Sequence, residues 1–108
     1  MNEIIDECRK LNQMIVNSKE YKNYIFAKNS IKAHEDLYGA LKEFKQRYSD
    51  IMRFTEGNPY DEILRLYYDN DELIHNSTVN EYLCAESAFS RLIKDVIGEI
   101  SGGFKMDI

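Results

Sequence analysis

The stretch "LYGALKEFKQRYSDI", residues 37–51, decides the fold class. Its large apolar residues recur at alternating steps of four and three, at Leu37, Leu41, Phe44, Tyr48 and Ile51. This spacing places them on one side of an α-helix, in a heptad seam that packs nearly parallel against another long helix. The seam is too short for a sustained coiled coil, so an antiparallel hairpin within the chain, or a second subunit, would cover it.

Helix breaks and capping residues divide the rest of the chain. Gly57 and Pro59 form the strongest interior break, and the apolar period slips over residues 32–36. Polar capping segments at 17–20 and 76–78 can each begin a new helix. The expected helices are therefore residues 2–16, a second from the 17–20 cap to the 32–36 break, a third carrying the seam, 60–75, and a last from the 76–78 cap to about residue 101.

These signals predict an all-α protein with about five amphipathic helices in a long antiparallel helical hairpin or bundle. Its length is that of one domain, expected at residues 1–101, with residues 102–108 as a flexible C-terminal tail. Few helical layers cannot cover so many apolar stripes within one chain. We therefore expect a homo-oligomer, most simply a symmetric dimer.

The helices at the two ends of the chain carry the cysteines. In the first helix, Cys8 lies between Ile4 and Leu11 on the apolar stripe, which predicts a buried, inert thiol. In the last helix, Cys84 falls on the side opposite the apolar stripe, together with Ala88 and Arg91. This second face is expected to be either solvated or covered by a partner.

Helices 18–32 and 76–101 echo one another at an offset of 58 positions. The echo pairs Tyr21 with Val79, Tyr24 with Tyr82 and Ala27 with Ala85. We interpret it as similar packing roles rather than as proof of duplication. The chain has eight tyrosines, and those on stripes suit either core packing or a protein interface. The aromatic candidates for packing or interface contact outside the seam are Tyr21, Tyr24, Tyr82 and Phe89.

Composition excludes several classes of function. The chain is 44% hydrophobic and 31% charged, and its net charge of −5 disfavours direct binding to nucleic acid. No apolar run reaches the length of a membrane span, and the N-terminus does not resemble a signal peptide. A cytoplasmic protein without a membrane partner is the expectation.

Motifs for catalysis and cofactors are missing as well. Phosphate-binding glycine loops and zinc spacings are absent, and a Glu72–His75 pair lacks the second element that a di-iron site needs. His75 is better placed to cap a helix. We expect no catalytic residue, no cofactor and no metal. The alternative is a small redox or metal-dependent protein that uses Cys84 with His75, which requires the two side chains to lie close together.

Three segments in order resemble the YlbF/YmcA/YheA family of small helical bacterial proteins. They are Ser18, Tyr21, Tyr24 and Ala27, then the leucine-spaced helix with Phe44, then the frame "EYLCAESAFSRLI" at residues 81–93. The resemblance covers about residues 2–101.

The resemblance implies a non-enzymatic, oligomeric regulator of competence, sporulation and biofilm formation. It implies action in a multiprotein complex that influences RNA processing through RNase Y, with other family members as partners. The regulatory complex is associated with iron–sulfur clusters held by cysteines, and some relatives have a cysteine-rich tail. This chain ends "SGGFKMDI" without a cysteine, so binding a cluster on its own is not expected.

Overall fold

This computed structural model describes residues 2–104, which form six helices and the segments that connect them. The helices are α1 (Glu3–Val16), α2 (Lys19–Lys32), α3 (Glu35–Phe54), α4 (Tyr60–Asp69), α5 (Asp71–Ile74) and α6 (Ser77–Ser101). No strand occurs within this range, so the predicted all-α class is confirmed. Of the tail expected at 102–108, residues 105–108 lie outside the described part.

Capping side chains begin helices at the two predicted segments. The Ser18 hydroxyl accepts a hydrogen bond from the amide of Tyr21 (3.2 Å) at the start of α2. The Asn76 carboxamide oxygen accepts from the amides of Thr78 (3.0 Å) and Val79 (3.2 Å) at the start of α6. Such bonds satisfy donors that the first helical turn leaves free. They explain why both helices begin where the sequence predicts.

The predicted helix over residues 60–75 is divided in two at Asn70. The Asn70 side chain donates a hydrogen bond to the carbonyl of Leu66 (2.8 Å) and competes with the helical pattern of the backbone. The chain then turns into the single short helix α5. On the helix before the break, Leu66 is buried, whereas Leu64 is exposed.

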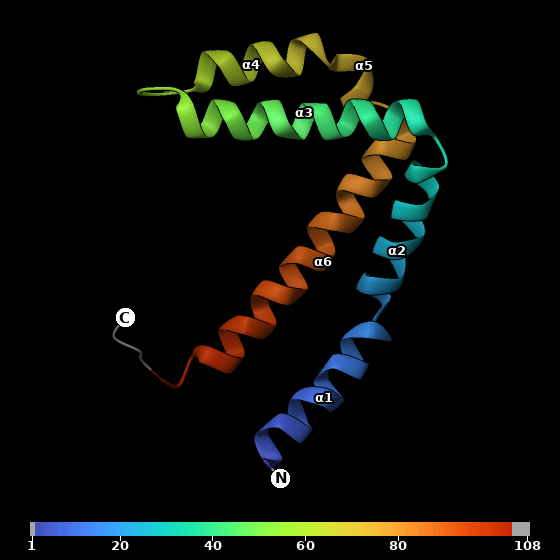
Figure 1. Cartoon of the computed structure of the whole chain (residues 1–108), viewed down its shortest axis with the longest axis vertical. Helices are drawn as coiled ribbons and strands as arrows, with labels where there is room; N and C mark the ends of the chain where they lie inside the picture. The colour runs from blue at the N-terminus through green and yellow to red at the C-terminus, as the bar shows by residue number, and fades with distance from the viewer. Residues whose placement is uncertain (1, 105–108) are drawn as a thin grey trace.

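Two antiparallel helix pairs form the frame of the molecule (Figure 1). In the first pair, which we call the leg, α2 runs beside the N-terminal part of α6, and α1 continues beyond α2 after a bend. In the second pair, the arm, α4 folds back on α3 after Gly57, whose φ of 78° suits the tight turn. The arm crosses the end of the leg, where α5 returns the chain to α6.

The core lies where the leg meets the arm. Buried side chains from α2, α3, α4 and α6 gather in one cluster, consisting of Ala27, Ile31, Leu41, Phe44, Leu66, Val79 and Tyr82. The molecule measures 53 × 37 × 17 Å with a radius of gyration of 18.0 Å. A compact domain of this length has a radius of gyration of about 13 Å. The open shape therefore leaves much of each helix without a partner in the same chain.

Within residues 2–104, no helix combines the length and apolar character needed to cross a bilayer.

Candidate interaction surface

An aromatic stack joins α2 to α6 along the leg. The rings of Tyr24 and Tyr82 stack with centroids 6.0 Å apart, and Tyr24 also stacks on Phe89 at 5.4 Å. Tyr21 meets Phe89 at 5.1 Å. Aromatic rings at these separations contribute more to stability than the burial of their apolar area alone. The structure thus brings together all the aromatic candidates outside the seam, and the Tyr24–Tyr82 pair shows that the echoed positions pack together.

The heptad seam of α3 packs mostly within the arm and toward the core. Leu41 and Phe44 are buried, Leu37 and Ile51 are half-buried, and Tyr48 is exposed. The ring of Tyr67 on α4 meets Phe44 at 5.5 Å and Tyr48 at 6.5 Å. The helix that covers the seam is therefore an antiparallel neighbour in the same chain, which leaves only the margin of the seam open to a partner.

A polar link ties the arm to the leg. The ammonium of Lys45 on α3 lies 2.7 Å from both carboxylate oxygens of Glu86 on α6. The hydroxyl of Tyr82 donates to the same carboxylate at 3.0 Å. The ion pair is about two-fifths exposed, so its contribution to stability is on the order of 1 kcal/mol or less. Its function is to fix the crossing of α3 over α6.

One ionisable group of this link, the Tyr82 phenol, has a changed pKa. Burial, assisted by the hydrogen bond to Glu86, raises the pKa of Tyr82 well above its ordinary value of 10.0. The phenol therefore stays protonated in the folded protein at a pH where the unfolded chain loses the proton. The stabilisation is fully present below about pH 10 and is lost as the pH rises toward the folded-state pKa.

We expect the Tyr82→Phe variant to lose less stability in alkali than the wild type. The wild-type free energy of unfolding should fall between neutral pH and about pH 11, and the variant's curve should be flatter. At neutral pH the variant should be less stable by about 0.5–1.5 kcal/mol, because it loses one hydrogen bond. Urea unfolding across this pH range checks both effects. The variant keeps the Lys45–Glu86 pair, so parallel alkaline curves would contradict the role of Tyr82.

A shallow apolar groove runs along the leg between α2 and α6. It encloses about 570 Å³ and is lined by Phe26 and Ala27 from α2 and by Cys84, Ala85 and Ala88 from α6, with polar residues at its rim. Phe26 is 75% exposed. Cys84, Ala88 and Arg91 are all exposed in the single chain, and the Cys84 thiol donates to the carboxamide of Asn80 at 3.8 Å.

The prediction that Cys8 is buried is wrong. Cys8 is exposed, and α1 contains no buried residue. The apolar stripe is present as the sequence indicates, but α1 extends past the part of the leg where α2 and α6 pair, and its main contacts are with α2. The stripe is therefore only partly covered within the chain: Leu11 and Ile15 are half-buried, whereas Ile4 and Cys8 are exposed.

The structure does not bring Cys84 and His75 together, as the redox or metal alternative requires. His75 ends α5, where its Nδ1 lies 2.8 Å from the carbonyl oxygen of Asp71. Cys84 lies about 12 Å along the axis of α6 from Asn76, at 1.5 Å per residue. Among residues 2–104, no three histidine, cysteine or acidic side chains gather in a way that could hold a metal ion.

Sequence reasoning missed two contributors to the frame. Lys45 and Glu86 are 41 positions apart, and no local pattern predicts that they pair. Leu66 lies in the apolar run "ILRLYY", which is compatible with more than one inward face until the break at Asn70 fixes its phase.

Comparisons with known proteins give relatives of this chain by sequence. The family model described as control of competence regulator ComK, YlbF/YmcA, matches residues 4–104. A UPF0342 protein of Desulfitobacterium hafniense strain Y51 is 34% identical over 106 residues, which cover 89% of this chain and 82% of that protein. No solved structure shows a significant match.

Proposed function

The chain belongs to the YlbF/YmcA family, which controls the competence regulator ComK, and we propose that it works through protein–protein contacts rather than catalysis. The observation that supports this proposal is the open frame, in which long helices expose apolar side chains from Ile4 at one end to Ile100 at the other. Apolar surface of this extent marks interaction sites in soluble proteins. The polar contacts of the frame cap helices, join neighbouring turns of one helix or link the arm to the leg.

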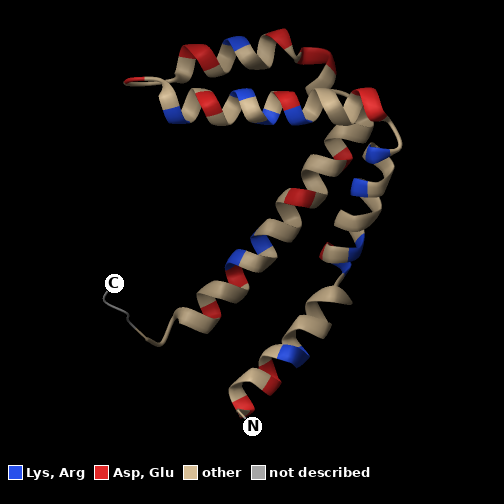
Figure 2. Cartoon of the chain, viewed as in Figure 1, with Lys and Arg blue, Asp and Glu red and all other residues tan. Residues whose placement is uncertain are grey.

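The proposed setting is a cytoplasmic multiprotein complex that influences RNA processing through RNase Y, with effects on competence, sporulation and biofilm formation. The chain self-associates and contacts other family members. It does not bind RNA directly: acidic and basic residues alternate along α3 and no helix of the described part carries an uninterrupted band of positive charge (Figure 2). Direct binding would need such a band to neutralise phosphates.

A strain that lacks the gene tests the proposal. RNase Y-dependent transcripts should accumulate unprocessed, and the wild-type gene should restore processing. A tagged copy of the chain should co-purify with RNase Y or with other family members from the native host. Purified chain alone should leave those transcripts intact. Normal processing in the deletion strain would refute the role in RNA processing, and cleavage by the purified chain would refute the non-enzymatic mode.

Self-association has a separate test. Light scattering at micromolar concentration should give at least twice the 12.7 kDa mass of one chain. The mass of a monomer would refute self-association, and the RNA-processing test in the deletion strain would remain independent of that result.

A further inference from the structure

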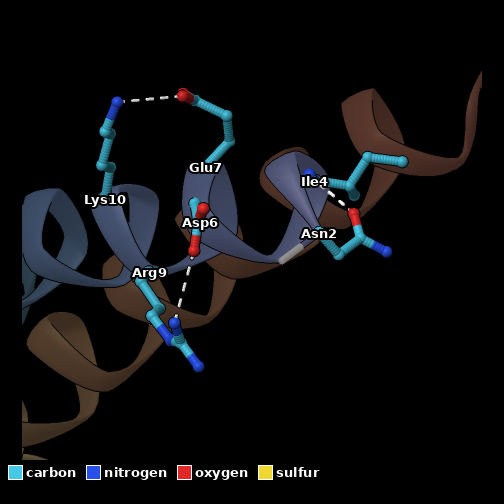
Figure 3. Close-up of polar contacts among 6 residues, drawn as sticks. All are labelled: Asn2, Ile4, Asp6, Glu7, Arg9 and Lys10. Atoms are coloured by element: carbon cyan, nitrogen blue, oxygen red, sulfur yellow. Dashed lines mark hydrogen bonds and ion pairs between the residues drawn. The ribbon is translucent and has the colours of Figure 1, made fainter.

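Helix α1 has side-chain contacts along its polar side, whereas its apolar side is largely exposed. Asn2 caps it through the amide of Ile4 (2.9 Å), and the pairs Arg9–Asp6 (3.3 Å) and Lys10–Glu7 (3.0 Å) hold the polar side (Figure 3). The apolar side, which we call the α1 face, consists of Ile4, Cys8, Leu11, Met14 and Ile15. An isolated helix of about 14 residues is marginal in water. Packing within the chain covers this side incompletely, because Leu11 and Ile15 are half-buried and the other three residues are exposed.

The area exposed by one chain fits a partner of substantial size. The chain exposes 8825 Å², whereas a compact monomer of its 12.7 kDa mass exposes about 6,200 Å². The surplus of about 2,600 Å² exceeds the roughly 800 Å² that each partner buries in a standard interface. The open surface of the chain is therefore large enough to include an interface with one further subunit.

The leg is also complementary to itself. It carries an apolar ridge, the α1 face, and an apolar groove between α2 and α6, each present once per chain. The α1 face spans residues 4–15 and the α2 side of the groove spans residues 19–27, so their centres lie near residues 9–10 and 23. The point midway between the centres is about residue 16, next to the bend that joins α1 to α2. A two-fold axis at this point brings the residues of each ridge level with the other copy's groove along the leg, and such a pairing closes on itself.

We propose that two copies of this chain pair antiparallel along their legs, about a two-fold axis near Val16–Ser18, with α1 of each copy seated in the α2–α6 groove of the other. This pairing rests on the self-association proposed above and specifies its surface. Val16, which is exposed in one chain, lies at the axis against its own counterpart.

The two native cysteines can test which residues of the two copies lie opposite one another. Cys84 lines the groove beside Phe26, about ten residues beyond the axis, and Cys8 lies about eight residues before it. The pairing therefore places Cys8 of one copy within about one helical turn of Cys84 of the other. In a single chain, Cys8 lies beyond the bend, past the end of α2 that is remote from the core.

Cross-linking the native dimer with a short bifunctional maleimide tests the register. The wild type should give a covalent dimer, and peptide mass spectrometry should identify a Cys8–Cys84 link between isotope-labelled and unlabelled copies. Cys8→Ser and Cys84→Ser should each reduce the covalent dimer at least tenfold. Mixing the two variants should restore part of it, because each supplies the cysteine that the other lacks.

Two other outcomes distinguish an error in the proposed interface from a failure of self-association. A light-scattering dimer that gives no Cys8–Cys84 link, or gives only links between like cysteines, overturns the antiparallel pairing while self-association stands. A monomer in light scattering overturns both. Either result leaves the RNA-processing phenotype of the deletion strain as an independent measure of the family role.

Discussion

Replacing Ile31 with alanine is expected to lower the free energy of unfolding by about 2–5 kcal/mol. Ile31 is 0% exposed and lies at the end of α2, within the core where the leg meets the arm. The substitution removes buried methyl groups and leaves a cavity among helices that already meet over a small area. Because a domain of this kind has a total stability of about 5–15 kcal/mol, the loss removes a large part of it.

Urea unfolding followed by circular dichroism measures this effect. Wild type and variant must be compared at the same protein concentration, because the dimerisation proposed above would make stability depend on concentration. Ile97→Ala on α6 is the matched control: it makes the same chemical change at a side chain that is 59% exposed. Its effect should lie within about 0.5 kcal/mol. Similar losses in both variants would contradict the placement of the core at the leg–arm junction.

The sequence predicts the helices well because their signals are local. Capping at Ser18 and Asn76 and the turn at Gly57 depend on residues within a few positions, and the structure confirms each of them. The echo between the two helices predicts similar packing roles for Tyr24 and Tyr82, and the structure adds that these two rings stack on each other. Local chemistry and repeated spacing therefore account for the fold class and most helix boundaries.

The residues near an apolar stripe do not determine which helix packs on it. Cys8 lies on a regular stripe, but the spacing does not say whether the covering helix belongs to the same chain, and here Cys8 is exposed. The ion pair between Lys45 and Glu86, which links the arm to the leg, joins residues 41 positions apart and forms only once the chain has folded. The exposed part of the α1 stripe is therefore the surface on which we propose that a second copy binds.

Placing glutamate at both Ile4 and Met14 is expected to raise the dissociation constant of the dimer roughly 100-fold or more. Burying an apolar side chain of this size contributes about 1.5–3 kcal/mol, and a charge in its place would have to be desolvated. Both residues are about 70% exposed in the single chain, so the folding of one copy should change little. Sedimentation equilibrium over a dilution series measures the constant. At dilutions where the variant is monomeric, circular dichroism should also show the helical signal of α1 diminished, because α1 loses the partner that stabilises it.

A matched pair on the arm serves as the control. Phe54 and Tyr68 are also large apolar side chains with comparable exposure, at 69% and 83%, but they lie away from the leg. Phe54→Glu with Tyr68→Glu adds the same charge to the same class of surface, so its dissociation constant should match the wild type. If the arm variant dissociates and the α1 variant does not, the interface lies on α3 and α4 and the pairing of the legs is wrong. If both dissociate equally, added charge rather than the α1 face controls assembly, because only a specific interface can distinguish two substitutions that are equivalent in chemistry and exposure.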